Sequence, residues 1–383
     1  MTRYAVLTNP GTNRVYGQGA PALALAELRT VAALLPEHGL GEPVAVERAG
    51  TSFVDVEKST PEAGARAGPE ATTATGTDVD VDAGPAPSCP VESVLASLSS
   101  TFALFRVHGE LLEPIETHVP RWFSDDLLTI LRYPGKTNEQ FTALLVRLAF
   151  AASRPAPADT AGPRGSTLDR WLAGAPTCVL DPLCGRGTTL NQALRDGCDA
   201  IGIDADRKDV EAYLSFLARY LETNRIKHRR SSSRPQPDGR RTLRTTYTIT
   251  PRGTGDPTHR PLTLDVINDD TRFVRDHIKG SSAHAVVADL PYGIQHGSRA
   301  DVRGESRNPA VLLSEALPVW RGVLRGGGAI ALSYNTKVIG RDEVDAALVE
   351  AGYLVVEALA DGRFSHRVDQ SIQRDISLAT KPG

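Results

Sequence analysis

The second half of the chain alternates short apolar runs with longer stretches in which apolar residues recur every three or four positions. The runs are rich in Val, Ile and Ala, which predicts buried strands, and the periodic stretches predict helices. Strands that alternate with helices are typical of an α/β fold, in which a parallel sheet is covered on both faces. The expected strands are 177–181, 200–204, 262–269, 283–290, 327–334, 353–359 and 374–380, and the expected helices are 188–197, 207–224, 311–324 and 341–352.

The beginning of the chain has a different pattern, which predicts a small α+β module. Residues 56–90 are dominated by Ala, Gly, Thr, Pro, Asp and Glu and contain no aromatic residue. Such a segment cannot bury enough apolar area to offset the entropy of ordering it, so we expect a disordered insert. We divide the chain into this N-terminal module, residues 1–120, and a larger domain, residues 121–383. The elements expected in the module are strands at 4–8 and 101–107 and helices at 21–35, beginning at a proline, and near 91–99.

Two further segments complete the organisation. Residues 137–153 predict a strong amphipathic helix, which either Thr137 or Asn138 can cap, and a linker rich in Pro, Ala and Gly follows. The stretch 228–262 interrupts the alternation of strands and helices, and its part 242–250 alternates like one arm of a hairpin. This basic insert is either a phosphate-binding element or a solvated loop. Its arginines are Arg229, Arg230, Arg234, Arg240, Arg241 and Arg244.

Composition narrows the class of protein. The chain has 383 residues and a formal net charge of −3, so no overall positive field indicates nucleic acid, although a local patch can. The four cysteines show no metal-ligand spacing and no obvious disulfide pairing, so we expect no metal and a reducing cytoplasm. The N-terminus lacks the apolar core of a signal peptide, and no apolar run is long enough for a bilayer. We therefore expect a cytoplasmic protein without membrane contact.

The segment "VLDPLCGRGTTL" (179–190) predicts a cofactor loop. Asp181 ends a strand, Gly185 and Gly187 allow a tight turn and close approach of a ligand, and Thr188 begins a helix. The sequence contains G-x-G but not G-x-G-x-x-G, and no P-loop signature is present, so the glycines alone are weak support. A plain turn at the start of a helix remains the alternative.

A series of acidic residues indicates which cofactor fits. Asp204 ends the next strand, where a carboxylate can accept both ribose hydroxyls of an adenosine. The strand after that ends in "NDDTR", and we favour Asp270 over Asp269 as the residue near an adenine amino group. The pyrophosphate of NAD would be repelled by Asp181, whereas S-adenosyl-L-methionine brings a cationic sulfonium and an amino group. Asp204 as a solvated loop residue is the alternative.

The segment "VVADLPYG" (286–293) predicts the chemistry. A carboxylate and a carbonyl that accept the two N–H groups of an exocyclic amine direct its lone pair at a methyl donor, and an aromatic ring stacks on the base. Asp289, the Leu290 carbonyl and Tyr292 supply these groups, and Pro291 stiffens the turn. The base must leave its stack to reach this depth. An ordinary Pro-Tyr-Gly turn is the alternative, and a cytosine C5 methyltransferase is disfavoured because it needs a cysteine after the proline.

At these motifs the sequence resembles class I S-adenosylmethionine-dependent methyltransferases. It is most similar to the tRNA guanine-10 N2-methyltransferase family and to relatives that methylate guanine N2 in ribosomal RNA. The resemblance implies a Rossmann-like fold with a seven-stranded, mostly parallel sheet whose last strand is antiparallel. The matching segments are "DPLCGRGTTL", "GIDAD", "NDDTR", "DLPYG" and "VLRGGGAIAL", within roughly 130–380.

The resemblance also assigns the residues. It places Asp181, Gly185, Gly187, Asp204 and Asp270 around the cofactor and 289–292 around the base. The motif here has Leu290 where many amino-methyltransferases have proline. The N-terminal region is too short for the ferredoxin-like and THUMP pair of the family, so we expect at most one module.

The expected function is methylation of an exocyclic amino group of a base in RNA, with guanine N2 in tRNA as the favoured target and tRNA or ribosomal RNA as the expected partner. A DNA adenine-N6 methyltransferase would use the same geometry. The sequence is also compatible with a non-catalytic module that binds nucleic acid or the cofactor, and with a methyltransferase that acts on a small-molecule amine.

Overall fold

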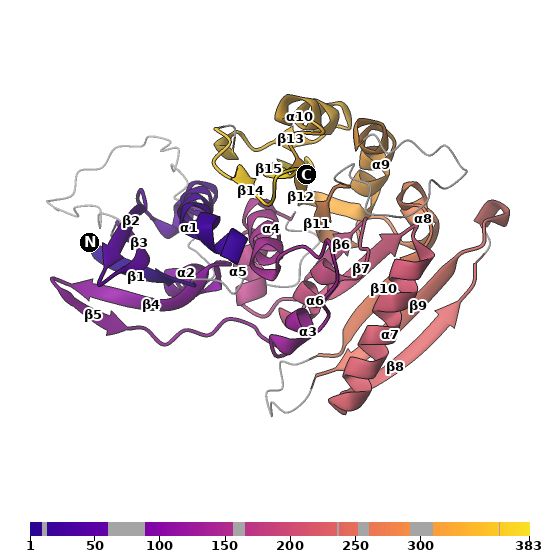
Figure 1. Ribbon diagram of the computed structural model, residues 1–383, viewed down its shortest axis with the longest axis horizontal. Coiled ribbons are helices and arrows are strands. Elements are labelled where there is room, and N and C mark those ends of the chain that lie inside the picture. The colour runs from indigo at the N-terminus through magenta and orange to yellow at the C-terminus, as the bar shows by residue number, and fades with distance from the viewer. Residues whose placement is uncertain are drawn as a thin grey trace, which may run out of the picture.

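The computed structural model describes residues 1–9, 14–59, 89–155, 165–235, 237–251, 260–291, 309–359 and 361–383. The elements form two sheets with helices between and around them (Figure 1). No helix among these residues has the length and apolar character required to cross a membrane.

The larger sheet has the order β13-β15-β12-β11-β6-β7-β10-β9-β8, with β14 paired to β15. The central strands β10, β7, β6, β11 and β12 are parallel, and β15 runs antiparallel to β12. This arrangement confirms the α/β class and is Rossmann-like. The strands are β6 (Cys178–Asp181), β7 (Asp199–Asp204), β8 (Lys227–Ser233), β9 (Leu243–Thr250), β10 (Leu262–Asn268), β11 (Ala283–Asp289), β12 (Leu324–Asn335), β13 (Leu354–Val355), β14 (His366–Arg367) and β15 (Gln373–Thr380).

The sheet has ten strands, three more than the seven that the resemblance implied. Two of the extra strands, β8 and β9, form an antiparallel hairpin from the basic insert, and residues 243–249 of β9 pair with β10. The hairpin is ordered because Tyr247 and Ile249 alternate into the core. The expected strand 353–359 is correct only at its start, since the chain turns at Glu357–Leu359 into a short 3₁₀ helix that buries Leu359.

Helices cover both faces of the larger sheet. On one face α4, α6 and α7 pack on alternate strand residues such as Val179, Ala285 and Ala331, and on the other α8, α9 and α10 pack on residues such as Leu180 and Val286. The helices are α4 (Glu139–Ala152), α5 (Thr167–Leu172), α6 (Thr188–Arg195), α7 (Arg207–Thr223), α8 (Val274–His277), α9 (Pro309–Val323) and α10 (Arg341–Glu350). The short helix α5, which the sequence analysis missed, begins at the capping box of Ser166 and Asp169.

The N-terminal residues form a separate antiparallel sheet in the order β2-β3-β1-β4-β5. With α1 and α2 its first four strands follow the β-α-β-β-α-β sequence of ferredoxin-like units. The elements are β1 (Thr2–Thr8), α1 (Arg14–Leu34), β2 (Val44–Arg48), β3 (Thr51–Lys58), α2 (Val91–Ser97), β4 (Thr101–His108) and β5 (Leu111–Pro114), and a short helix α3 (Asp126–Thr129) leads to the larger sheet.

Two expected boundaries in this region are wrong. Helix α1 begins seven residues before Pro21, because apolar contacts hold a stretch whose glycines lower its helix propensity. The segment 56–90 was assigned too widely, since 56–58 belong to β3 and Cys89 is buried before α2. Residues 60–88 and the linker part 156–164 lie outside the described residues.

A buried group of side chains ties the N-terminal residues to α5. Asp169 Oδ1 lies 2.8 Å from His38 Nε2 and accepts a hydrogen bond from Cys89 Sγ at 3.3 Å. Its other oxygen accepts from the Ser166 hydroxyl and backbone N–H. The ligand atoms of His38, Cys89 and Asp169 lie close enough together to hold a metal ion, but their distances are those of hydrogen bonds. We therefore interpret the group as a structural tether.

Replacing the central carboxylate should destabilise the fold. We expect Asp169→Ala to lower the free energy of unfolding by about 3 kcal/mol, because buried donors lose their acceptor. Burial raises the pKa of Asp169, but the bonds from His38 and Ser166 outweigh it and hold the pKa below its ordinary value. The contribution is therefore present at neutral pH and is lost as the pH falls below that ordinary value. Urea unfolding at pH 7 measures the effect, with the exposed Asp238→Ala as control.

Candidate active site

Three of the predicted acidic residues lie at one edge of the larger sheet. Asp181, Asp204 and Asp289 are the last residues of β6, β7 and β11. Strand β6 lies between the other two and runs parallel to both. The loop 181–188 and the corner that begins at Asp289 therefore leave neighbouring strands in the same direction (Figure 1). The two motifs, about a hundred residues apart in sequence, share one end of the sheet.

The loop after β6 turns on its two glycines. Gly185 has φ +46°, and its N–H donates to Asp204 Oδ2 at 2.8 Å. A Cβ at this position would meet none of the residues that the structure describes within 4 Å. Gly187 has φ +79° and caps α6, but a Cβ at this position would lie 2.3 Å from the Tyr213 ring. Gly187 thus allows the close packing of this ring, whereas at Gly185 the described residues leave room for a ligand.

Negative charge is concentrated at this edge. Burial, together with the nearby Asp204 and Asp289, raises the pKa of Asp181 to about 7. Burial also raises the pKa of Asp204, although its two oxygens accept the N–H groups of Gly185 and Asp206. A cationic ligand would relieve this repulsion, so the edge fits a group with positive charge.

The acidic pair after β10 has structural partners. Asp270 caps the turn Thr271–Phe273 and pairs with the Arg272 guanidinium through both oxygens. Burial raises the pKa of Asp270, but the hydrogen bonds from Arg272 outweigh it and leave the pKa below its ordinary value. Asp269 Oδ2 lies 2.8 Å from His277 Nε2. Contact of Asp270 with an adenine amino group stays a prediction.

The Asp289 carboxylate is held from three sides. The Thr137 hydroxyl donates to Oδ2 at 2.7 Å, the Ser333 hydroxyl donates to Oδ1 at 2.8 Å, and the Arg374 guanidinium lies 3.5 Å from Oδ2. Arg374 in turn lies over the Phe141 ring. All three groups are donors, so they fix the carboxylate as an acceptor at this edge.

Leu290 and Pro291 follow Asp289 at the end of β11. Leu290 is buried and donates its N–H to the Ser333 carbonyl at 2.8 Å, and Pro291 is exposed. Tyr292 lies outside the described residues, so its stacking role stays a prediction.

A segment before α4 spans the two motifs. The Tyr133 and Thr188 hydroxyls lie 3.2 Å apart, and the Arg186 guanidinium lies over the Tyr133 ring. Four residues after Tyr133, Thr137 reaches Asp289. The helix cap itself is Asn138, which accepts the Phe141 N–H. Thr137 was considered only as a cap, and no local pattern indicated its contact with Asp289.

Comparison with known proteins gives a likeness of structure only. No family model matches the chain, and no curated protein matches its sequence. A methyltransferase from Pyrococcus furiosus is 13% identical, with 68% of this chain and 93% of that chain covered and a TM-score of 0.37. An rRNA methylase from Streptococcus thermophilus is 10% identical, with 54% and 88% covered and a TM-score of 0.31. A TehB-like SAM-dependent methyltransferase from Corynebacterium glutamicum is 14% identical, with 55% and 83% covered and a TM-score of 0.30. The chemistry therefore has to come from the residues of this chain.

Proposed function

We propose that this protein is an S-adenosyl-L-methionine-dependent methyltransferase that modifies an exocyclic amino group of a base in RNA. The observation that carries the proposal is the position of Asp181 and Asp289 at the carboxyl ends of the neighbouring parallel strands β6 and β11. This position brings a site suited to a cationic cofactor next to an amine-binding carboxylate. The bound cofactor supplies an electrophilic methyl group.

The cofactor site uses the loop and the two acidic residues. Asp181 faces the positively charged end of the cofactor, Gly185 allows the backbone to approach it, and Asp204 accepts the ribose hydroxyls. The fit is supported by the raised pKa of Asp181, which is buried among other carboxylates and gains from a nearby cation.

The amine site uses the corner after β11. Asp289 accepts one N–H of the amine and the Leu290 carbonyl accepts the other, which directs the nitrogen lone pair at the methyl group. Thr137, Ser333 and Arg374 keep the carboxylate in place for this contact. Tyr292 stacks on a base that has left its stack.

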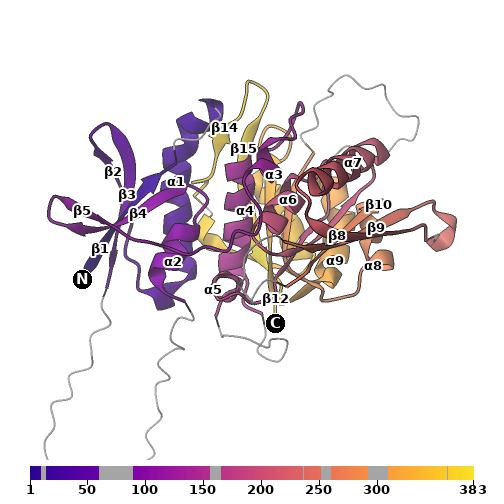
Figure 2. The same cartoon turned by 90° about the horizontal axis from the view of Figure 1, so that it is seen from below.

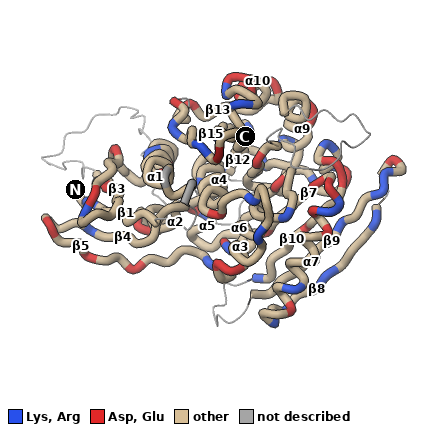
Figure 3. The backbone as a smooth tube through the Cα atoms, in the orientation of Figure 1, with Lys and Arg blue, Asp and Glu red and all other residues tan. Residues whose placement is uncertain are grey.

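The basic hairpin supports RNA as the substrate. Because β9 is antiparallel to β10, the register places Ser233, Arg244 and Asn268 together, at the edge of the sheet that carries the acidic residues. Arg234 and Arg241, at the connection between β8 and β9, are exposed at this edge, and Arg229 and Arg230 follow along β8 (Figure 3). Such a row of cations is suited to phosphates near the target base. We favour guanine N2 in tRNA or ribosomal RNA, in the cytoplasm.

Nucleoside mass spectrometry of cells that lack the protein tests the substrate. Loss of N2-methylguanosine from RNA is the expected result, and the purified protein should restore the methyl group to that RNA with labelled cofactor. Loss of N6-methyladenine from DNA would instead identify the alternative DNA enzyme. The proposal would be overturned if the methylated nucleosides of RNA and of DNA were both unchanged and the purified protein transferred no methyl group to RNA extracted from these cells.

Cofactor binding should also release a proton. The apo protein holds a proton on Asp181 below about pH 7, and a cationic ligand favours the ionised carboxylate. We therefore expect affinity for S-adenosylmethionine to rise with pH until about 7 and then level off. Calorimetry of cofactor binding at pH 6, in buffers of different ionisation enthalpy, measures the number of protons released. The Asp181→Asn variant should release none.

A further inference from the structure

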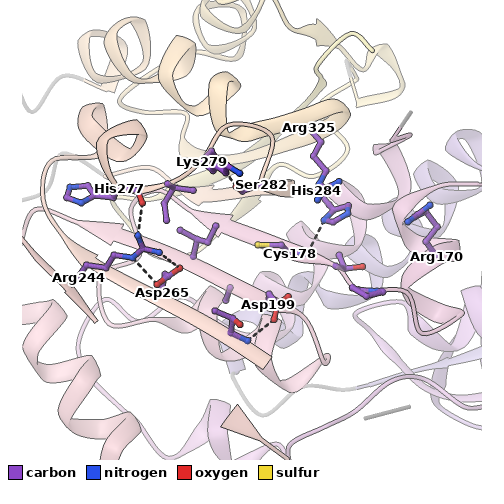
Figure 4. A pocket seen from close by; sticks show the side chains of 16 residues that line it. Arg170, Cys178, Asp199, Arg244, Asp265, His277, Lys279, Ser282, His284 and Arg325 are labelled. Carbon is purple, nitrogen blue, oxygen red and sulfur yellow. Dashed lines mark hydrogen bonds and ion pairs between the residues drawn. The ribbon is translucent and has the colours of Figure 1, made fainter. Parts of the chain in front are cut away.

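A cavity of about 640 Å³ is lined by residues of several strands of the larger sheet and extends from the amino ends of its central strands to Arg244 (Figure 4). Cys178 and Asp199, which line it, begin β6 and β7, and His284 is the second residue of β11. The candidate active site lies at the other end of these same strands. Asp181, Asp204 and Asp289 do not line the cavity, so its lining differs from that of the proposed reaction site.

Cationic side chains dominate the lining. Arg170, Arg244, Lys279 and Arg325 line the cavity, and the carboxylates among its described lining residues, Asp199 and Asp265, are paired with arginines. Arg260 lies 2.9 Å from Asp199, and Arg244 lies 2.9 Å from Asp265. Figure 4 shows Arg170 and Arg325 on either side of His284 at one end and the Arg244–Asp265 pair at the other. The cavity therefore carries net positive charge.

His284 provides a neutral donor beside these cations. Burial, together with the charges of Arg325, Arg170 and Arg260, lowers its pKa to about 3. The ring is neutral at pH 7, and its Nδ1 accepts the Cys178 N–H at 3.1 Å, so the proton is on Nε2. The same field affects Arg170, whose pKa is lowered by burial and then by Arg325. The two arginines therefore add positive potential at this end of the cavity, which favours an anionic ligand.

We propose that this cavity binds a phosphate-bearing small molecule of nucleotide size. Arginine forks and a lysine suit the several oxygens of a phosphate, and a neutral imidazole adds a hydrogen bond without further charge repulsion. Pro176, Ile201 and Ile278 supply an apolar wall for a ring system. The volume lies within the range of about 300–1,000 Å³ typical of small-molecule pockets. The inference does not depend on the proposed methyl transfer.

Calorimetric titration of the full chain with pyrophosphate and with adenosine 5′-monophosphate tests the proposal. We expect binding of at least one probe and at least tenfold weaker binding in Arg325→Ala. Tighter binding of the nucleotide than of pyrophosphate identifies a ligand with a ring system, and equal binding identifies the phosphate group alone. The exposed Lys279→Ala provides a second variant should Arg325→Ala fold poorly.

The matched control is Arg207→Ala, which removes an exposed arginine on α7. It should leave probe binding unchanged, and S-adenosylmethionine binding should be the same in all variants that fold. Absence of binding of either probe at millimolar concentration would overturn the proposal. Binding that persists in both Arg325→Ala and Lys279→Ala would overturn it as well.

Discussion

Replacing Asp289 by Ala should lower methyl transfer roughly 10³-fold, within the 10²–10⁴-fold range expected of a group that acts directly on the reacting proton. The carboxylate accepts an N–H of the amine and is held by the Thr137 and Ser333 hydroxyls. Without it the nitrogen lone pair stays delocalised in the base, and the methyl group meets a poor nucleophile. Single-turnover methylation of RNA with labelled cofactor measures the rate.

Cofactor binding separates this effect from misfolding. Asp289→Ala should bind S-adenosylmethionine within about twofold of the wild type, because the carboxylate that it removes binds the acceptor amine and not the cofactor. A variant pair at Thr137 adds a finer test. Thr137→Val removes the hydroxyl that reaches Asp289 and should slow transfer about tenfold, the effect of about one charge-assisted hydrogen bond, whereas Thr137→Ser keeps the hydroxyl and most of the rate. Wild-type turnover in Asp289→Ala would contradict the assignment.

Replacing Asp204 by Ala should weaken cofactor binding by roughly 100-fold, the effect of losing about 3 kcal/mol in two hydrogen bonds to a charged acceptor. The same change releases the Gly185 N–H, which donates to this carboxylate at 2.8 Å. The stability of the apo fold should change little, because relief of the desolvation and charge repulsion that raise the pKa of the half-buried Asp204 offsets the loss of an acceptor for the Gly185 and Asp206 N–H groups. Calorimetry measures the affinity and thermal unfolding the stability.

Asp209→Asn is the control for this variant. Asp209 belongs to the same acidic edge but pairs with Arg186 at 2.8 Å. Its replacement should change cofactor affinity only about twofold, since a screened, half-exposed pair contributes little. Equal weakening by both substitutions would show that general charge at the edge, and not Asp204 itself, controls binding.

The positions of Asp181, Asp204 and Asp289 at one edge of the larger sheet could be predicted from the sequence, because a strand is recognised from neighbouring residues alone. An apolar run that ends in an acid is visible in five or six residues, and parallel strands bring such ends together. Asp181, Asp204 and Asp289 therefore lie where the pattern indicated. Asp270 shows the limit of the same reasoning. It caps a 3₁₀ turn and forms an ion pair with Arg272, and the sequence pattern alone does not distinguish these structural roles from ligand binding.

The groups that hold Asp289 could not be predicted in this way. Thr137, Ser333 and Arg374 are 152, 44 and 85 positions away in sequence, and each belongs to a different element. A threonine before a helix, a serine in a strand and an arginine at the start of another strand are unremarkable locally. Only the pairing of β11 with β12 and of β12 with β15 brings two of them to the carboxylate.

Helix α4 has a consequence for how the chain can be divided. Every residue from Phe141 to Ala152 is buried, and the helix lies between the N-terminal sheet and the larger sheet (Figures 1 and 2). Even Arg147 is enclosed, with Asp196 at 2.7 Å and the Trp171 ring beneath its guanidinium. A shortened protein starting near residue 121 would present one side of this helix to water and should aggregate, and heating the intact chain should give a single cooperative transition.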